Sequence, residues 1–213
     1  MQLAPPPVVG PQYCCTYATD VAILRKAMTL SSGNFVVTNS SGDLIFKVKG
    51  ALLTLHDRRV LIDATGQPVL TLRREIRADH GPWRAFKGKS SDMRDLVFTA
   101  KMSSAIQLEL EVFLANNRNE DVRDFNVKGF ERSCVIYAGQ PPCIVAQMQK
   151  ETGIQTQSVP LGKDKFMVTV YPNIDCAFIV ALIVIFDEIK KGGLVTTATL
   201  STQVRKFVCW CNF

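Results

Sequence analysis

Histidine is scarce in this sequence, and the short motifs of common enzyme chemistries are missing. Only His56 and His80 occur, and the chain contains no G-x-S-x-G nucleophile elbow, no Cys-His signature and no Gly-rich phosphate loop. His56 and Asp57 are adjacent, but they fall between two predicted strands, where a polar pair is ordinary turn chemistry. We therefore predict no catalytic residues, no cofactor and a protein that is not an enzyme, with paired-carboxylate chemistry left open.

Metal-binding spacing is also missing, although the chain has seven cysteines. No C-x-x-C pair occurs and neither histidine lies near a group of cysteines, whereas a structural zinc needs four ligands at close spacing. We predict no metal site. Cys134, Cys143 and Cys176 lie inside apolar runs and are predicted to be small core residues, which is typical of a reducing compartment.

No apolar run is long enough to cross a membrane. The longest, Ala177–Phe186 (AFIVALIVIF), would extend about 15 Å as a helix, against about 30 Å for a bilayer core. The acids Asp175, Asp187 and Glu188 bound both of its ends. Because a helix that is apolar all round and cannot span a bilayer should be buried on every side, we predict a central helix at about residues 174–190. Asp175 is predicted to be its N-cap or an acid of its first turn.

The stretch from about Val21 to Pro172 alternates short β-favouring runs with turn signals. In Ala105–Val112 every second residue is apolar and most of the others are polar, which is typical of a strand with one buried and one solvated face. About a dozen such strands indicate an antiparallel sandwich or barrel. Closing the sheet removes its edges, and the predicted helix would fill the lumen. The predicted fold is therefore mainly β, a closed antiparallel β-barrel of about twelve strands around a central C-terminal hydrophobic helix.

We divide the chain into three segments. Residues 1–20 form a Pro-rich N-terminal arm, in which residues 1–12 are predicted to be extended and poorly ordered. Residues 21–191 form the barrel and its helix, and the following glycines are a reasonable helix stop. Residues 192–213 are Thr-rich, end in an aromatic tip that contains cysteine, and form a C-terminal extension of unknown order.

Several stretches resemble the plant LURP-one-related family, a branch of the tubby-like superfamily that also includes the phospholipid scramblases. The strongest is LGKDKFMVTVYPNIDCAFIVALIVIFDEI at Leu161–Ile189. The others are Leu55–Asp63, Pro68–Arg74, Met93–Ser104, Leu110–Asn117 and Glu131–Gly139. The resemblance implies a twelve-stranded barrel around a central helix, and a non-enzymatic interaction or signalling role in a plant cell, in stress or defence. Members of this family usually end shortly after the helix, so residues 194–213 are a departure.

Positive charge is concentrated in one part of the chain. The formal net charge is +6, and the segment Arg58–Arg94 alone has nine basic and four acidic residues, a net of +5. A basic patch on neighbouring strands could hold phosphates through Arg forks and Lys charges. In tubby proteins such a face binds phosphoinositide headgroups, so the resemblance implies an anionic phospholipid site on the outer strands. The predicted site residues are Arg58, Arg59, Arg73, Arg77, Arg84, Lys87 and Lys89. A solvated strand face that prevents edge pairing is the alternative.

Three other roles remain as alternatives. Scramblase-like lipid handling with calcium would need six to eight oxygen ligands, and Leu161–Asp175 supplies only the carboxylates of Asp164 and Asp175. A membrane-tethered, transcription-linked regulator would touch DNA, but the chain shows no recognition helix, zinc finger or RNP-type aromatic stripe, so specific nucleic-acid binding is not expected. Cysteines near both ends could accept palmitate if those ends are exposed. These are Cys14, Cys15, Cys209 and Cys211.

The first ten residues lack a basic region followed by an apolar one, so no secretory signal is predicted. We expect a cytoplasmic monomer that is peripheral at a membrane, with the nucleus left open and protein partners unknown.

Overall fold

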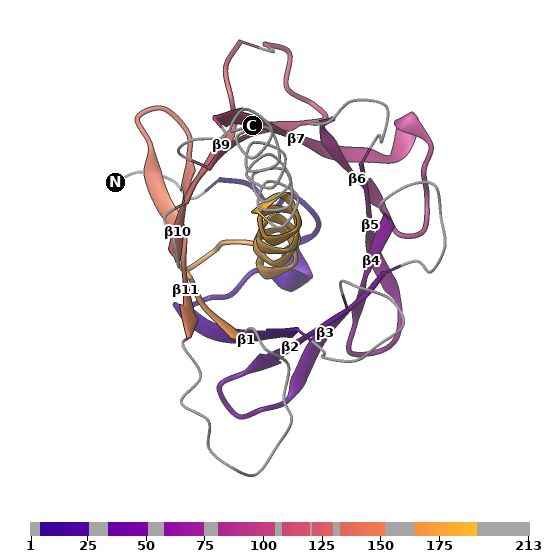
Figure 1. The fold of residues 1–213 in the computed structure, drawn as a ribbon, viewed down its shortest axis with the longest axis vertical. Helices are drawn as coiled ribbons and strands as arrows, with labels where there is room; N and C mark the ends of the chain where they lie inside the picture. Colours follow the sequence, from indigo (N-terminus) through magenta and orange to yellow (C-terminus); the bar gives the residue numbers. More distant parts are fainter. Residues whose placement is uncertain are drawn as a thin grey trace, which may run out of the picture.

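Twelve antiparallel strands form a closed barrel around a central helix (Figure 1). The structure is a computed structural model that describes residues 5–25, 34–50, 58–74, 81–104, 108–119, 121–129, 133–151 and 165–190. Each strand pairs with its neighbours in sequence, and β1 closes the barrel by pairing with β12. The predicted fold is therefore confirmed.

The elements have the following bounds. The strands are β1 (Thr19–Arg25), β2 (Phe35–Asn39), β3 (Leu44–Gly50), β4 (Arg58–Asp63), β5 (Pro68–Arg74), β6 (Trp83–Lys87), β7 (Leu96–Ser104), β8 (Glu109–Leu114), β9 (Phe125–Gly129), β10 (Ser133–Ala138), β11 (Cys143–Glu151) and β12 (Lys165–Val170). Two short 3-10 helices are η1 (Pro11–Tyr13) and η2 (Met93–Asp95), and the central helix covers residues 176–190.

The strands follow from period-2 alternation of apolar side chains. In β12, Phe166, Val168 and Val170 are buried, and the residues between them are half-buried. In the predicted strand Ala105–Val112 only the second half forms β8, where Leu110 and Val112 face the core. Its beginning differs because Leu108 has a positive φ of 44° and lies in a turn, while residues 105–107 lie outside the described residues.

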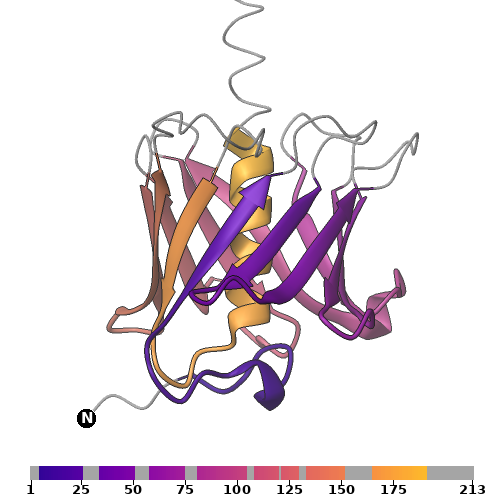
Figure 2. The ribbon, with the colours of Figure 1, turned by 90° about the horizontal axis from the view of Figure 1, so that it is seen from below.

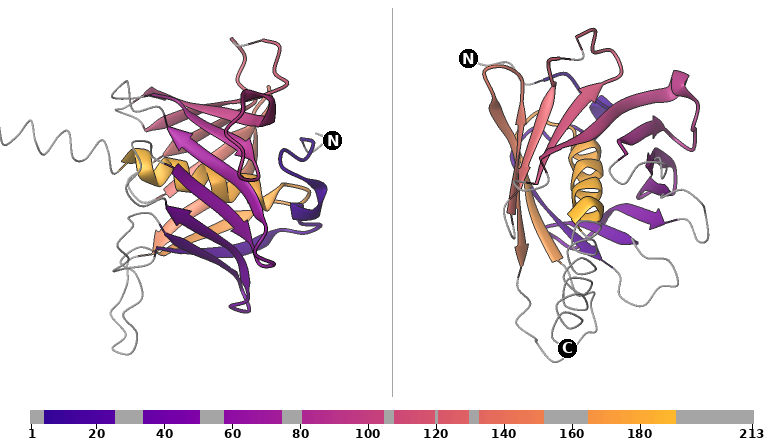
Figure 3. Two further views of the ribbon diagram at one scale, coloured as in Figure 1. Left: turned by 90° about the vertical axis from the view of Figure 1, so that its right-hand side faces the viewer. Right: turned by 45° about the horizontal axis from the view of Figure 1, so that its top comes forward.

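The central helix runs along the barrel axis and is buried on every side over the predicted apolar run (Figures 1 and 3). Phe178 makes edge contacts with the rings of Phe98 and Phe125, at centroid distances of 5.2 and 4.7 Å. Such pairs stabilise beyond the area that they bury. The predicted N-cap is confirmed, since the Asp175 carboxylate accepts a hydrogen bond of 3.1 Å from the Phe178 N–H. Within the described ranges, no helix is long and apolar enough to cross a membrane.

The N-terminal arm differs from the extended, poorly ordered segment that its prolines predict. Residues 5–18 lie across the barrel end at which the helix begins (Figure 2). Val8, Val9 and Tyr13 pack against the core, and Asp175 accepts hydrogen bonds from the N–H groups of Val9 and Gly10, at 2.7 and 3.0 Å. The arm is ordered because the open barrel end offers apolar contacts and a buried carboxylate. The first strand also begins at Thr19, before the predicted barrel boundary.

Gly129 at the end of β9 lies too close to the helix to accept a side chain. A Cβ there would lie 2.7 Å from Cε2 of Phe186 and 3.1 Å from the carbonyl oxygen of Leu108. Phe186 is only 2% exposed, so its ring has little room to move. This contact fixes the distance between the barrel wall and the last turns of the helix.

We expect Gly129→Ala to lower the free energy of unfolding by about 1–3 kcal/mol, because overpacking displaces Phe186. At an unstrained strand position the same change would raise the free energy of unfolding by up to about 1 kcal/mol. The sign of the change therefore shows whether Phe186 blocks a side chain at this position. Urea denaturation should show that Gly129→Ala lowers the free energy of unfolding less in a Phe186→Leu protein than in the wild type. An equal cost in both backgrounds would contradict the wall-to-helix contact.

Candidate functional site

Three arginines stand in register on the outer face of β4, β5 and β6. Arg58 is directly opposite Arg73, and Arg73 is directly opposite Arg84. Their neighbours along each strand, such as Leu61, Leu72 and Ala85, are buried in the core, so the arginines point outward. We call Arg58, Arg73 and Arg84 the arginine ladder. Like charges at opposed strand positions destabilise a sheet, and a bound anion would remove that repulsion.

The turn after β6 folds back over the outer face of β5 beside the ladder. Thr71 donates its hydroxyl hydrogen to the Gly88 carbonyl at 2.7 Å, and the Gly88 N–H donates to the Val69 carbonyl at 2.9 Å. Arg58 donates through Nη2 to the carbonyl of Lys89 at 3.3 Å, while its buried Nε has no partner among the described residues. The turn therefore brings Lys89 to the ladder.

The other predicted headgroup residues are divided between this face and the interior. Lys87 and Lys89 are exposed at the end of β6 and in the turn that follows. Arg77 lies outside the described residues. The structure adds Lys47 and Lys49, which are exposed on the neighbouring strand β3. Net charge along the chain does not point to these two lysines, because they lie outside the basic segment Arg58–Arg94, but their alternation with Phe46 and Val48 indicates an outward position.

Arg59 is a correction to the predicted site. It is 5% exposed and faces the lumen, because it shares the inward face of β4 with Leu61. Its Nη2 atom lies 2.9 Å from Oε2 of Glu188 on the helix. A second ion pair joins Arg25 of β1 to Asp187. These pairs attach the last turns of the helix to the barrel wall, so Arg59 is structural and does not contact ligands on the outer face.

Two cysteines meet at the opposite end of the helix. A hydrogen bond from the Cys176 thiol lowers the pKa of Cys15 to about 6, although burial opposes the shift. The same hydrogen bond and burial raise the pKa of Cys176 well above its usual value. Cys15 is half-buried, and its carbonyl oxygen accepts a hydrogen bond of 2.6 Å from Asn173. Cys15 therefore carries a thiolate at neutral pH, held beside the first turn of the helix.

The remaining cysteines are placed as follows. Cys134 and Cys176 are buried, as predicted, and Cys143 is half-buried. Cys14, named above for lipidation with Cys15, is half-buried within the packed arm and forms a β-bridge with Asp175. Cys209 and Cys211 lie outside the described residues. In the part of the chain that the structure describes, no three His, Cys, Asp or Glu side chains are grouped so as to hold a metal ion.

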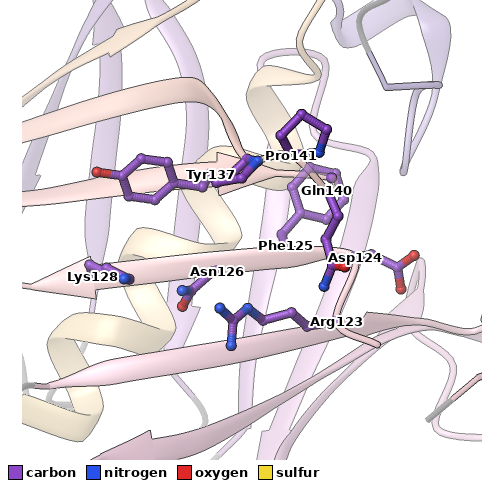
Figure 4. Close-up of a pocket in the computed structure, with 10 residues that line it drawn as sticks. Arg123, Asp124, Phe125, Asn126, Lys128, Tyr137, Gln140 and Pro141 are labelled. Carbon is purple, nitrogen blue, oxygen red and sulfur yellow. The ribbon is translucent and has the colours of Figure 1, made fainter. Parts of the chain in front are cut away.

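A pocket of about 480 Å³ on the outer face of β9 and β10 is a second candidate site (Figure 4). Its residues come from the loop before β9, from both strands and from the turn after β10. The sequence alone does not indicate this pocket, because no motif marks its polar residues. They come together only through the pairing of β8, β9 and β10.

A closed barrel with a helix through its lumen is the architecture of the tubby-like superfamily. Residues 19–187 match the family model described as LURP-one-related, which spans every strand and most of the helix. The chain therefore belongs to the LURP-one-related family. It is 52% identical to Protein LURP-one-related 15 of Arabidopsis thaliana over 86% of each chain, and 47% identical to Protein LURP1 of the same plant over 90% and 94%.

The fold also matches a solved structure. An X-ray structure of a protein from Arabidopsis thaliana is similar with a TM-score of 0.67 at 45% sequence identity. The match covers 86% of this chain and 98% of that one.

The thiol pair yields a direct test. Iodoacetamide should alkylate Cys15 with a midpoint near pH 6, since its lowered pKa keeps the thiolate populated above that pH. Cys134 is the internal control, because burial raises its pKa to about 12 and should keep it unmodified in the folded protein. Mass spectrometry of the labelled peptides reports both sites. A midpoint near pH 9 for Cys15 would contradict the hydrogen bond from Cys176.

Proposed function

We propose that this protein is a non-enzymatic signalling protein that binds phosphoinositide headgroups at a membrane surface through the arginine ladder. The register of Arg58, Arg73 and Arg84 is the observation on which the proposal rests. Arginines on three adjacent strands bring guanidinium N–H donors close together, and such donors match phosphate oxygens in geometry and charge. Membership of the plant LURP-one-related family supports a setting in plant stress or defence signalling.

The positive charge around the ladder favours a ligand with several phosphates over one with a single phosphate. Lys87 and Lys89 lie on one side, and Lys47 and Lys49 lie on the neighbouring strand β3. Within the described residues, Arg73 has no hydrogen-bond or ion-pair partner and is available to a ligand. Attraction of this kind is screened by salt, so binding should weaken as ionic strength rises.

The interior supports a role without catalysis inside the barrel. Side chains of the central helix and the inner strand faces are buried against one another. A ligand of the ladder would contact only the outer face, and would leave this packing unchanged. DNA could also contact a basic face through its phosphates, but the described residues offer no exposed helix of the length that reads a major groove.

Flotation with phosphatidylcholine vesicles that contain a phosphatidylinositol bisphosphate tests the proposal. The wild-type protein should float with these vesicles, and not with pure phosphatidylcholine. Arg73→Gln should weaken binding by about tenfold or more, because charge-assisted hydrogen bonds to phosphate are lost. The same variant should be slightly more stable without lipid, by up to about 1 kcal/mol, since it removes like-charge repulsion.

Two control variants separate the ladder from general charge. Lys165→Gln removes one positive charge from β12, where Lys165 pairs with Glu151 at 2.8 Å, and should leave flotation unchanged. Arg59→Gln should also leave flotation unchanged while lowering the free energy of unfolding by about 3 kcal/mol, because the buried ion pair with Glu188 is lost. The proposal fails if wild-type protein does not float with the anionic vesicles. It fails equally if Lys165→Gln and Arg73→Gln reduce flotation alike.

A further inference from the structure

The pocket lies on β9 and β10, on the side of the barrel away from β4, β5 and β6, which carry the arginine ladder (Figure 1). Its walls include Arg123, Asn126, Lys128 and Tyr137, with Pro141 at the rim. A volume of about 480 Å³ is within the range of pockets that bind small molecules. This volume and the mixture of charged, amide and aromatic groups point to a compact ligand with more than one kind of contact.

Asn126 has a buried acceptor atom with no partner. The residue is 6% exposed, and its Nδ2 atom donates to Oε1 of Glu109 at 2.7 Å. Because an ionised carboxylate only accepts hydrogen bonds, this contact fixes the orientation of the amide. The Oδ1 atom is therefore the free one, and it has no hydrogen-bond partner among the described residues. Buried polar atoms without a partner are rare, and this one belongs to a side chain that lines the pocket, so we take it as the place of a missing donor.

Two cations stand on either side of this amide. Arg123 donates through Nη1 to Oε1 of Glu111 at 2.8 Å, which leaves the other edge of its guanidinium available. The Lys128 amino group lies 4.0 Å from Oε1 of Glu109, a loose pair. Figure 4 shows Arg123, Asn126 and Lys128 side by side along one edge of the pocket. A carboxylate at this edge would lie between two positive charges.

An aromatic wall completes the pocket. Tyr137 on β10 is directly opposite Asn126 on β9, and its ring extends along the pocket across from the polar row (Figure 4). The one acid that lines the pocket, Asp124, is already engaged. Its Oδ2 atom accepts hydrogen bonds of 2.8 Å from the Leu114 N–H and from Asn117. The two carboxylates that contact the polar row are also engaged, Glu111 by Arg123 and Glu109 by Asn126.

We propose that this pocket binds a small organic acid that carries a hydrogen-bond donor and an aromatic ring. The donor would reach Oδ1 of Asn126, the carboxylate would lie between Arg123 and Lys128, and the ring would pack against Tyr137. A site built to receive a donor discriminates strongly against analogues that lack it, because the buried acceptor is then left unpaired. The competing explanation is an ordered water on Asn126, which would need no ligand.

N-acetyl-L-tryptophan is a suitable probe, because it has a carboxylate, an amide N–H and an aromatic ring. Titration followed by ¹H–¹⁵N NMR should shift the Asn126 side-chain amide and the backbone of Gly139, and leave Arg73 unchanged. Asn126→Ala should lower the affinity for the probe by about tenfold, because one hydrogen bond is lost. The uncharged N-acetyl-L-tryptophanamide should also bind more weakly than the acid.

Arg123→Gln keeps the test decisive if Asn126→Ala does not fold, since Arg123 lies at the surface and its loss should be tolerated. Arg123→Gln should lower the affinity for the probe and leave vesicle flotation unchanged. Arg73→Gln should reduce vesicle flotation and leave the affinity for the probe unchanged. No shift of pocket resonances at about 10 mM probe, a concentration at which even very weak ligands bind, would overturn the proposal and leave the water explanation. Equal affinity in the wild type and Arg123→Gln would overturn it as well.

Discussion

The packing of the barrel wall against the central helix is the constraint on which the rest of this structure depends. Every side chain from Ile174 to Phe186 is buried, and Phe178 lies against rings from β7 and β9. A barrel of this size needs such a filling, because twelve strands enclose more space than their own side chains occupy. The side chains of the inner face therefore pack against the helix, and only side chains on the outer face remain able to contact a ligand.

Adjacent residues of one strand illustrate this division. Arg58 points outward into the arginine ladder, and Arg59 points inward to Glu188. Ion pairs at one end of the helix and the Asp175 cap at the other hold it along the axis. On β4, the strand face therefore decides whether an arginine attaches the helix to the wall or stands on the outer surface.

Local patterns were sufficient to predict the architecture, whereas the two sites depend on the register between neighbouring strands. Alternation and the length of Ala177–Phe186 predicted the barrel and its helix. The ladder depends on which residues stand opposite one another, and the register shift between Leu61 and Ile62 in the β4–β5 pair alters that pairing in a way that alternation does not reveal. The pocket acceptor of Asn126 likewise depends on Glu109 of a neighbouring strand. The order of the arm depends on Asp175, far away in sequence.

The central claim is that the helix is scaffold and that the membrane is met by the outer strands. Hydrogen–deuterium exchange with and without phosphoinositide vesicles tests this most directly. We expect the amides of residues 176–190 to stay strongly protected in both conditions, while β5, β6 and the turn at Gly88 gain protection on vesicles. Faster exchange of the helix on vesicles, with no change in those strands, would contradict the claim, because it would show the helix leaving the barrel to meet the lipid.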